Sequence, residues 1–283
     1  MKTIGLIGGM SWESSKLYYE FLNTKAKEVL GGSHSAKCIM VSVDFADIER
    51  LTFKGDWNAI GELIKEAAQQ LERAGAEVIL LCTNTIHLVS HYISENVTIP
   101  FLHIATTTGD AIKKIGLKKV ALLGTKFTME KDFYTKTLTN HFGLDIIIPD
   151  AGSRQVVHDI IYNELVKGQF TKTSKQKIIR IIKELQRQGA EGVILGCTEL
   201  PILISESDID IPTFDTGKIH AHEAIEWGLK HIKRDKKKQP RKFNNVLTML
   251  FNRYINAMTN WLFFKPCQTS ASHKDDVGRL IHK

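Results

Sequence analysis

The chain contains an internal repeat. The segment Arg73-Ala-Gly-Ala-Glu-Val-Ile-Leu-Leu-Cys-Thr-Asn recurs without a gap, about 114 positions later, as Arg187-Gln-Gly-Ala-Glu-Gly-Val-Ile-Leu-Gly-Cys-Thr. Each copy has the pattern of a helix end, a turn, a buried strand and a polar loop. Aligned residue by residue, Cys197 stands opposite Thr83, and Cys82 stands opposite Gly196. The repeat therefore predicts two similar half-sites with unlike side chains.

Strand-like runs alternate with helical patterns around both copies. Thr3-Ile-Gly-Leu-Ile-Gly-Gly precedes the first copy, and Lys119-Val-Ala-Leu-Leu-Gly-Thr takes the same place before the second. This alternation indicates mostly parallel sheets. We expect an α/β fold of two pseudo-symmetric, Rossmann-like parallel-sheet domains, the first formed by residues 1–105 with 211–230 and the second by residues 106–210. A tail would follow at 231–283.

The two domains should share a cleft. Open parallel sheets bind ligands at the carboxyl ends of their strands, and both Thr83 and Cys197 follow a predicted strand. We therefore expect the active site in the cleft between the domains. The alternative is a duplication that left similar core strands with no chemistry at their tips.

Charge and cysteine content narrow the function classes. Residues 230–283 carry thirteen Lys and Arg against three Asp, a net charge of +10. Because the whole chain has a net charge of +7, residues 1–229 have a net charge of −3. The folded part is mildly acidic, which does not favour a nucleic-acid partner. The four cysteines form no CxxC pair and the N-terminus has a strand pattern rather than a secretory one, so we expect reduced thiols, no metal and a cytoplasmic location.

Cys197 is the first candidate for catalysis. It lies in Gly196-Cys-Thr-Glu, between a buried strand and a predicted helix. Nearby backbone N–H groups and a helix N-terminus favour a thiolate, and Thr198 and Glu199 add polar side chains. The alternative is a cysteine that only fills space in the core.

Two polar turns of the first half are candidate binding elements. Thr83-Asn84-Thr85-Ile-His87 offers hydroxyls, an amide and an imidazole for a carboxylate, although the same residues could cap a helix. Gly8-Gly-Met10-Ser11 is a predicted lip for a small carboxylate, with a plain β–α turn as its alternative. Its spacing fits neither a dinucleotide fingerprint nor a phosphate loop.

These elements together resemble the aspartate/glutamate racemase family, in particular its broad-specificity amino-acid racemase branch. The resemblance covers residues 1–230. It is carried, in this order, by Gly-Leu-Ile-Gly-Gly-Met-Ser-Trp-Glu-Ser at 5–14, Asn84-Thr-Ile-His, Leu122-Leu-Gly-Thr125 with Thr128, Gly196-Cys-Thr-Glu, and Phe214-Asp-Thr with His220.

The resemblance implies racemisation of glutamate or aspartate without pyridoxal phosphate or any other cofactor, in a homodimer. In the family, one cysteine thiolate removes the α-proton of the substrate and a second thiol returns a proton to the opposite face. Met10, Ser11, Asn84, Thr85, Thr125, Thr128, Thr198 and Glu199 would line the substrate site.

Thr83 departs from this two-cysteine pattern. Successive side chains of a strand face opposite sides, so if Thr83 faces the cleft, Cys82 faces the core. We therefore assign Thr83 as the partner of Cys197. An alcohol such as threonine has a pKa near that of water and is a far weaker acid than a thiol, whose pKa is about 8.5. Cys197 would therefore remove the α-proton of the substrate. Thr83, which is a poor base, would donate or relay the proton that returns to the carbanion.

A cation should pair with the side-chain carboxylate of an acidic substrate. Arg50 and Lys167 are the candidates, because arginine offers a bidentate fork and lysine a point charge, and Thr52 is a weaker neighbour of Arg50. The alternative for each cation is an exposed position on a helix.

The tail at 231–283 falls outside the resemblance. It joins a basic linker to an amphipathic helical pattern from Phe243 to Phe264 that is too polar to span a bilayer. Docking on its own domain or disorder is favoured over contact with an anionic membrane surface or a partner groove.

Two other functions fit the same motifs. A related enzyme, of the hydantoin racemase, maleate isomerase or arylmalonate decarboxylase type, would suit a single cysteine. A catalytically silent protein that binds a small carboxylate would explain Thr83 as a mark of lost activity.

Overall fold

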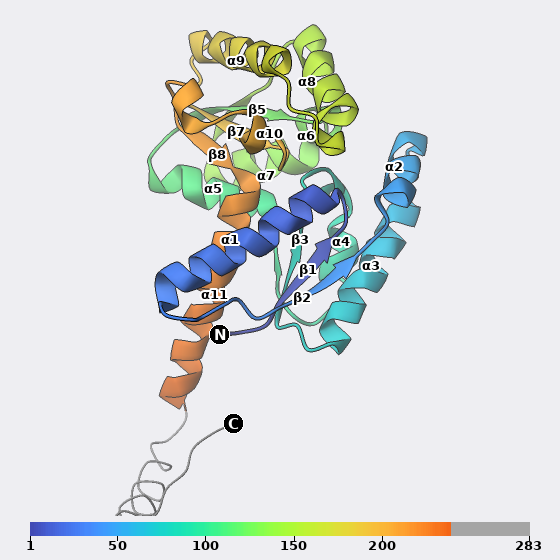
Figure 1. The fold of residues 1–283 in the computed structure, drawn as a ribbon, viewed down its shortest axis with the longest axis vertical. Coiled ribbons are helices and arrows are strands. Elements are labelled where there is room, and N and C mark those ends of the chain that lie inside the picture. Colours follow the sequence, from blue (N-terminus) through green and yellow to red (C-terminus); the bar gives the residue numbers. More distant parts are fainter. Residues whose placement is uncertain (239–283) are drawn as a thin grey trace, which may run out of the picture. The chain divides into compact units, whose positions relative to one another are not determined.

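The computed structural model describes residues 1–238, in which helices and parallel strands alternate as the sequence predicts (Figure 1). The elements of the first half are β1 (Ile4–Gly8), α1 (Trp12–Leu30), β2 (Cys38–Ser42), α2 (Phe45–Lys54), α3 (Trp57–Arg73), β3 (Val78–Leu81), the 3₁₀ helix η1 (Thr85–Val89), α4 (His91–Ser94) and β4 (Phe101–Leu102). Helix α2 is not predicted from the sequence, and a short 3₁₀ helix stands where a helix from Thr85 is expected.

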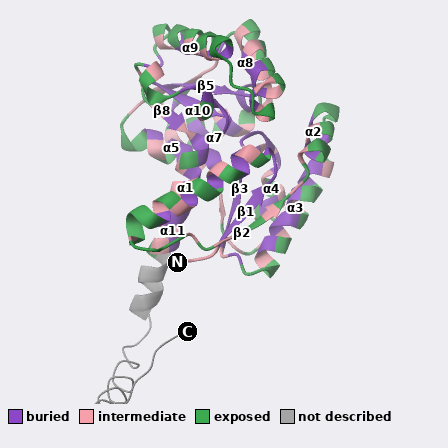
Figure 2. Cartoon of the chain, in the orientation of Figure 1, coloured by how far each residue is buried: buried purple, intermediate pink, exposed green. Residues whose placement is uncertain are grey.

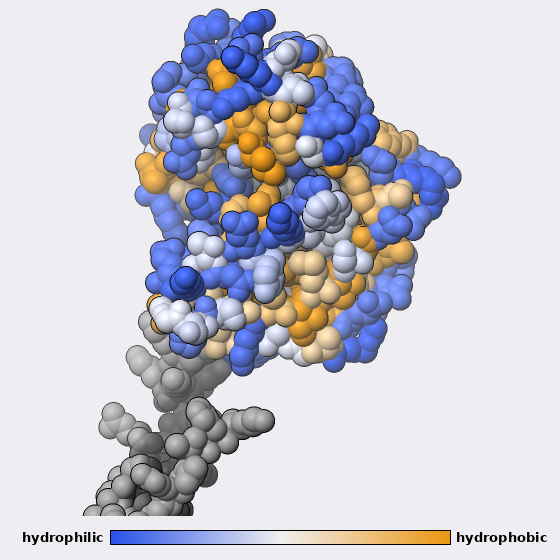
Figure 3. All heavy atoms as spheres, in the orientation of Figure 1, coloured by the Kyte–Doolittle hydropathy of each residue, from blue (hydrophilic) through white to orange (hydrophobic). Residues whose placement is uncertain are grey.

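The second half repeats this order. Its elements are α5 (Ile104–Lys114), β5 (Lys119–Gly124), α6 (Lys126–Glu130), α7 (Asp132–Phe142), β6 (Asp145–Ile147), α8 (Ala151–Asn163), η2 (Leu165–Lys167), α9 (Lys172–Arg187), β7 (Gly192–Gly196), α10 (Leu200–Leu203), η3 (Glu206–Asp208), β8 (Thr213–Asp215) and α11 (Thr216–Lys238). Where α8 and α9 cover the upper end of the view in Figure 3, the surface is largely hydrophilic.

The two sheets have the same topology and the same register. Their strand orders are β2-β1-β3-β4 and β6-β5-β7-β8, and every pair is parallel. Ile7 of β1 pairs with Leu81 of β3, and Leu123 of β5 pairs with Leu195 of β7. These pairs occupy equivalent positions of the sequence repeat. The prediction of two pseudo-symmetric parallel-sheet units is therefore confirmed.

The central strands β1, β3, β5 and β7 are almost entirely buried on both faces (Figure 2), as expected for parallel sheets covered by helices, whereas the outer strands are partly exposed. In the first sheet, Ile79 and Leu81 pack towards α3, whereas Val78, Leu80 and Cys82 pack towards α1 and α11. This alternation places the side chain of Cys82 in the core, fully buried. A single larger cluster fills the second half around β5 and β7.

The helix that follows the last strand of each sheet packs against the opposite sheet. Helix α5 follows β4 but places Ile104, Ala105 and Ile112 in the core of the second half. Helix α11 follows β8 and places Ala221, Ala224 and Ile225 in the core of the first half. These two crossings tie the halves together, and residues 1–234 form one compact unit.

The segment 211–230 needs a correction. The sequence suggests that all of it belongs to the first domain, but β8 pairs with β7 in the second sheet. Strand β8 pairs with β7, the strand that precedes it in the chain, and only helix α11 packs on the first half. Helix α11 also continues to Lys238, into the stretch expected as a basic linker. The rest of the tail lies outside the described residues.

No helix within residues 1–238 is long and apolar enough to cross a membrane.

Candidate active site

A pocket lies where the carboxyl ends of the strands of both halves meet. Thr83 and Cys197, the two residues that the repeat aligns, both line this pocket. Of the other expected site residues, the lining includes Met10, Ser11, Thr52, Asn84, Thr85, Thr125, Thr198 and Glu199.

Cys197 is hydrogen-bonded to the carboxylate of Glu199. Its Sγ donates a hydrogen bond of 3.0 Å to Oε2 of Glu199, which also accepts a bond from the Thr198 hydroxyl. Oε1 of Glu199 accepts a 2.6 Å bond from Ser11 Oγ, from the other half of the chain. Because Cys197 and Glu199 are 8% and 3% exposed, these bonds are shielded from water.

The thiol form of Cys197 is favoured in this arrangement, contrary to the expectation of a thiolate. Burial raises the pKa of Cys197 well above its ordinary value, and the charge of Glu199 raises it further. The backbone N–H groups of Glu199 and Leu200 act in the opposite direction but are outweighed. Helix α10 has only four residues, so its N-terminus contributes little.

Thr83 occupies the matching place in the first half. It follows β3, is partly exposed to the pocket and forms no side-chain hydrogen bond with another described residue. Cys82 does not line the pocket, and burial raises the pKa of its thiol far above the usual range. The strand alternation predicted this placement of both residues.

Three threonine hydroxyls join the two halves beside the pocket. Thr85 Oγ1 lies 2.9 Å from Thr125 Oγ1 and 3.3 Å from Thr128 Oγ1, and the latter two are 3.2 Å apart. Thr128 is fully buried and does not reach the pocket, so it supports the other two instead of lining the site.

Asn84 has an acceptor without a partner. Its Nδ2 donates to Thr216 Oγ1 at 3.0 Å, and Thr216 in turn donates to the carbonyl of Leu195 at 3.0 Å. These bonds fix the amide orientation, and Oδ1 is left buried with no hydrogen bond. A ligand with an N–H donor would satisfy it.

The glycine turn after β1 has a structural role as well as a position on the pocket. Gly9 has a φ of +94°, and a Cβ there would collide with the carbonyl oxygen of Val43. Its amide donates to Ser15 Oγ at 2.7 Å, so this N–H does not face an anion. The pocket lining comes instead from Met10 and Ser11.

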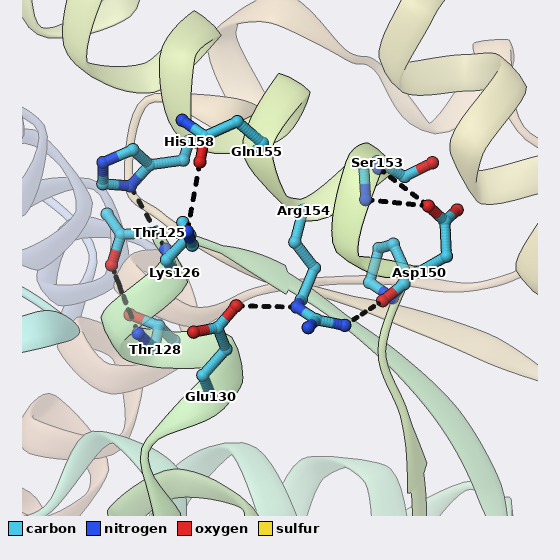
Figure 4. A network of polar contacts seen from close by, with 11 residues as sticks. Thr125, Lys126, Thr128, Glu130, Asp150, Ser153, Arg154, Gln155 and His158 are labelled. Carbon is cyan, nitrogen blue, oxygen red and sulfur yellow. Dashed lines mark hydrogen bonds and ion pairs between the residues drawn. The ribbon is translucent and has the colours of Figure 1, made fainter.

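The equivalent turn after β5 is fixed by side chains (Figure 4). Thr125 caps α6 by accepting from the Thr128 amide at 3.2 Å, and the Lys126 amide donates to His158 Nδ1 at 3.3 Å. Farther from the pocket, Arg154 donates to Glu130 at 2.8 Å and so ties α8 to the end of α6. The side chain of Thr125 is thereby held towards the pocket.

The two expected cations do not line the pocket. Arg50 is exposed on α2 and forms an ion pair with Asp47 at 3.2 Å, and Lys167 is exposed at the end of η2. Both are next to lining residues in the chain, since Ile48 and Thr52 flank Arg50 and Val166 precedes Lys167. Thr52 lines the pocket, but its hydroxyl donates to the Ile48 carbonyl at 2.7 Å.

Sequence reasoning misses the apolar wall of the pocket. Its members are Phe45 and Ile48 of α2, Ile86 of η1, Ile161 and Tyr162 of α8, and Val166. Apolar residues on helices are ordinarily assigned to the core, so only the known three-dimensional structure reveals them. Glu199 is the one charged residue among the described residues that line the pocket.

Within residues 1–238, no group of three or more His, Cys, Asp or Glu side chains is arranged to hold a metal ion.

Comparison with known proteins agrees with this architecture. The family model of Asp/Glu/Hydantoin racemase matches residues 7–224. The broad specificity amino-acid racemase RacX of Bacillus subtilis is 28% identical over 172 residues, which cover 60% of this chain and 73% of that protein.

Two solved structures share the fold over 81% of this chain and all of their own. A candidate Asp/Glu racemase from Yersinia pestis is 48% identical, with a TM-score of 0.76. An aspartate racemase homologue from Pyrococcus horikoshii OT3 is 37% identical, with a TM-score of 0.69. The chain therefore belongs to the Asp/Glu/Hydantoin racemase family and is a racemase-type isomerase.

Proposed function

We propose that this protein racemises an acidic amino acid, aspartate or glutamate, without a cofactor, by means of Cys197 and Thr83. The observation that carries the proposal is that these two residues, at equivalent positions of the two halves, line one pocket. Two mirror-related products require acid/base groups on the two faces of one carbon atom, and a pseudo-symmetric pair of strand ends supplies them.

The polar groups of the pocket suit the common part of an amino acid. Glu199 and the unpartnered Oδ1 of Asn84 can accept hydrogen bonds from an α-ammonium group. The hydroxyls of Thr85, Thr125 and Thr198 can donate to an α-carboxylate.

The reaction begins with the thiol proton of Cys197. Glu199 accepts this proton, and the thiolate removes the α-proton of the substrate to leave a carbanion. The hydroxyl of Thr83 gives its proton to the other face of the carbanion and recovers one from water, so no free alkoxide accumulates. Cys197 is again a thiol once it holds the α-proton, so loss of the Glu199 proton to the hydroxide that Thr83 leaves in the water restores the starting state.

A positive substrate ammonium next to Cys197 lowers the cost of forming the thiolate. The raised pKa of Cys197 then belongs to the empty site, and binding brings the charge that offsets burial and the repulsion from Glu199.

The side-chain carboxylate of the substrate needs a positive partner, which the apolar wall does not provide. Arg50 and Lys167 are the candidates because they lie next to wall residues on α2 and η2. Rotation of these long side chains over the mouth would pair them with the carboxylate and release Arg50 from Asp47.

Unlike groups on the two faces make the two directions differ. Cys197 can deprotonate one enantiomer, whereas Thr83 is a poor base for the other. The equilibrium constant between enantiomers is one, so kcat/KM must be equal in the two directions, and the asymmetry appears in kcat and KM separately.

The proposal is tested by incubating the full chain, without pyridoxal phosphate, with L- and D-aspartate and L- and D-glutamate, and following enantiomer content by chiral chromatography. Conversion of an acidic amino acid would support it. Thermal stabilisation by these ligands without any conversion would instead favour the silent binding protein. The homodimer and the cytoplasmic location stay predictions.

A further inference from the structure

His87 connects the Thr83 side of the pocket to the second half of the chain. Its Nδ1 lies 2.7 Å from the carbonyl oxygen of Thr83, and its Nε2 lies 3.2 Å from the amide nitrogen of Ile104. The imidazole is 1% exposed. Ile104 is the first residue of α5, the helix that crosses into the core of the second half.

These two contacts define the state of the ring. A carbonyl oxygen can only accept, so Nδ1 must carry the hydrogen, and a backbone N–H can only donate, so Nε2 must be bare. Burial lowers the pKa of His87 well below its ordinary value, and the neighbouring His103 and His220 act in the same direction. The ring is therefore neutral and cannot serve as a proton donor or acceptor for the reaction.

Both bonded groups would otherwise have no backbone partner. The Thr83 carbonyl lies before η1, and the Ile104 amide is at an open helix N-terminus. The ring is also packed against Phe101, His103 and His220, at centroid distances of 5.6, 4.7 and 5.9 Å. Small displacements of His87 would thus be transmitted to the peptide of Thr83.

We infer that His87 is a positioning residue for the Thr83 face of the active site. It holds the Thr83 peptide through Nδ1 and anchors that peptide to α5 through Nε2. This inference rests on the proposed function, because it assigns His87 to the step in which Thr83 returns a proton. Cys197 has no contact with His87, so proton removal by Cys197 should not depend on it.

The inference predicts a change in the fate of the carbanion. If Thr83 is displaced, Cys197 returns the proton to the face from which it came, and the substrate exchanges its α-hydrogen without inversion. In D2O, the ratio of exchange with retention to inversion should therefore rise. General destabilisation would lower both rates and leave the ratio unchanged.

Two substitutions separate the bonds of His87. In His87→Asn, the side-chain amide can replace Nδ1 and still donate to Thr83, while the Ile104 bond is lost. In His87→Gln, the amide oxygen can replace Nε2 and accept from Ile104, while the Thr83 bond is lost. Each variant loses one buried hydrogen bond, so the two are matched in stability.

The test measures retention and inversion by NMR and chiral chromatography, in D2O, for the wild type and both variants. Relative to the wild type, His87→Gln should lose inversion by about 10- to 100-fold, as expected for a misplaced reacting group. His87→Asn should keep a ratio within about twofold of the wild type, the scatter expected of context-dependent effects. His91→Asn, at an exposed position of α4 without a ring contact to His87, is the control.

Equal ratios in the two His87 variants would overturn the inference while leaving the proposed function intact. No exchange by the wild type would overturn the proposed function and the inference with it. Should a variant not fold, ¹⁵N NMR of the wild-type ring decides instead. A neutral ring protonated at Nδ1 supports the inference, and one protonated at Nε2 overturns it.

Discussion

The Sγ atom of Cys197 lies 3.0 Å from Oε2 of Glu199, and both residues are buried at the junction of the two halves. In the proposed mechanism this carboxylate accepts the thiol proton when the substrate is bound. The same carboxylate disfavours a thiolate at Cys197 when no substrate is bound, because two negative charges in a buried site repel each other. The contact therefore links the reactivity of Cys197 to the charge that a substrate brings.

Replacing Glu199 with Gln should alter the pH dependence in a defined direction. Loss of the negative charge lowers the pKa of Cys197, so alkylation by iodoacetamide should begin at a lower pH than in the wild type. Racemisation should nevertheless fall by about 10²- to 10⁴-fold, because the proton acceptor is lost. Glu206→Gln, on the exposed η3, is the control, and an unchanged alkylation profile in Glu199→Gln would contradict the account.

The two buried cysteines should respond differently to substitution by alanine. Cys197→Ala should abolish α-proton exchange. Cys82→Ala should keep most of the activity and lose about 1 kcal/mol of unfolding free energy, since its side chain only packs in the core. Exchange assays and denaturant unfolding of both variants provide the measurement, and the reverse pattern would overturn the assignment of Thr83 over Cys82.

Substitutions of Thr83 should separate exchange from inversion. Thr83→Ala should keep exchange at the Cys197 face and lose inversion, whereas Thr83→Ser should retain part of both. Thr83→Cys supplies a second thiol, so kcat from the enantiomer that Thr83 must deprotonate should rise. Deuterium incorporation into each enantiomer, measured from both starting enantiomers, checks this. A Thr83→Ala variant that inverts its substrate at the wild-type rate would rule out the proposed role.

Removal of Arg50 or Lys167 should weaken binding of acidic substrates only. Arg50→Ala and Lys167→Ala should each raise KM for aspartate or glutamate by about 10- to 30-fold, as loss of a charged hydrogen bond of about 1.5–2 kcal/mol implies. Lys177→Ala, exposed on α9, should leave KM unchanged. Steady-state kinetics provide the measurement. Wild-type KM values in both Arg50→Ala and Lys167→Ala would exclude these cations from binding the substrate carboxylate.

The buried histidines should make the fold sensitive to acid. Burial lowers the pKa of His103 to about 4 and that of His220 to about 3, while in the unfolded chain both stay near 6.5. Between these values the unfolded state binds more protons, so stability falls as the pH is lowered from about 6.5 to 4. The expected loss is up to about 1.4 kcal/mol per pH unit for each histidine.

Urea unfolding across this pH range measures the effect. His103→Asn should reduce the slope, because it removes one titrating group and preserves the helix cap. A slope equal to that of the wild type would show that His103 does not contribute.

The sequence predicts the paired sheets well because short stretches of sequence are enough to reveal the strands. Apolar strand runs and a gapless repeat fix the register, so the placements of Thr83, Cys82 and Cys197 follow from side-chain alternation. The ionisation of Cys197 does not follow, because it depends on burial and on the carboxylate of Glu199. The pairing of β8 with the second sheet likewise depends on tertiary contacts, and a strand of three residues is too short to reveal its partner from the sequence.

The pocket wall was equally hidden from sequence reasoning. Ile48, Ile161 and Val166 have the spacing of core residues, and only the packing of α2 near α8 and η2 turns them towards a cavity. In the sequence, His87 belongs to a polar turn whose residues could cap a helix. The structure agrees with that description but shows that one of the capped groups belongs to Thr83.

The most direct test of the account is a parallel reaction in D2O, without pyridoxal phosphate, of wild type and Cys197→Ala with each enantiomer of aspartate and glutamate. The account predicts that the wild type incorporates deuterium at Cα and inverts at least one of these amino acids, with different kcat values from its two enantiomers, and that Cys197→Ala does neither. Absence of exchange in the wild type, or full exchange in Cys197→Ala, would contradict it.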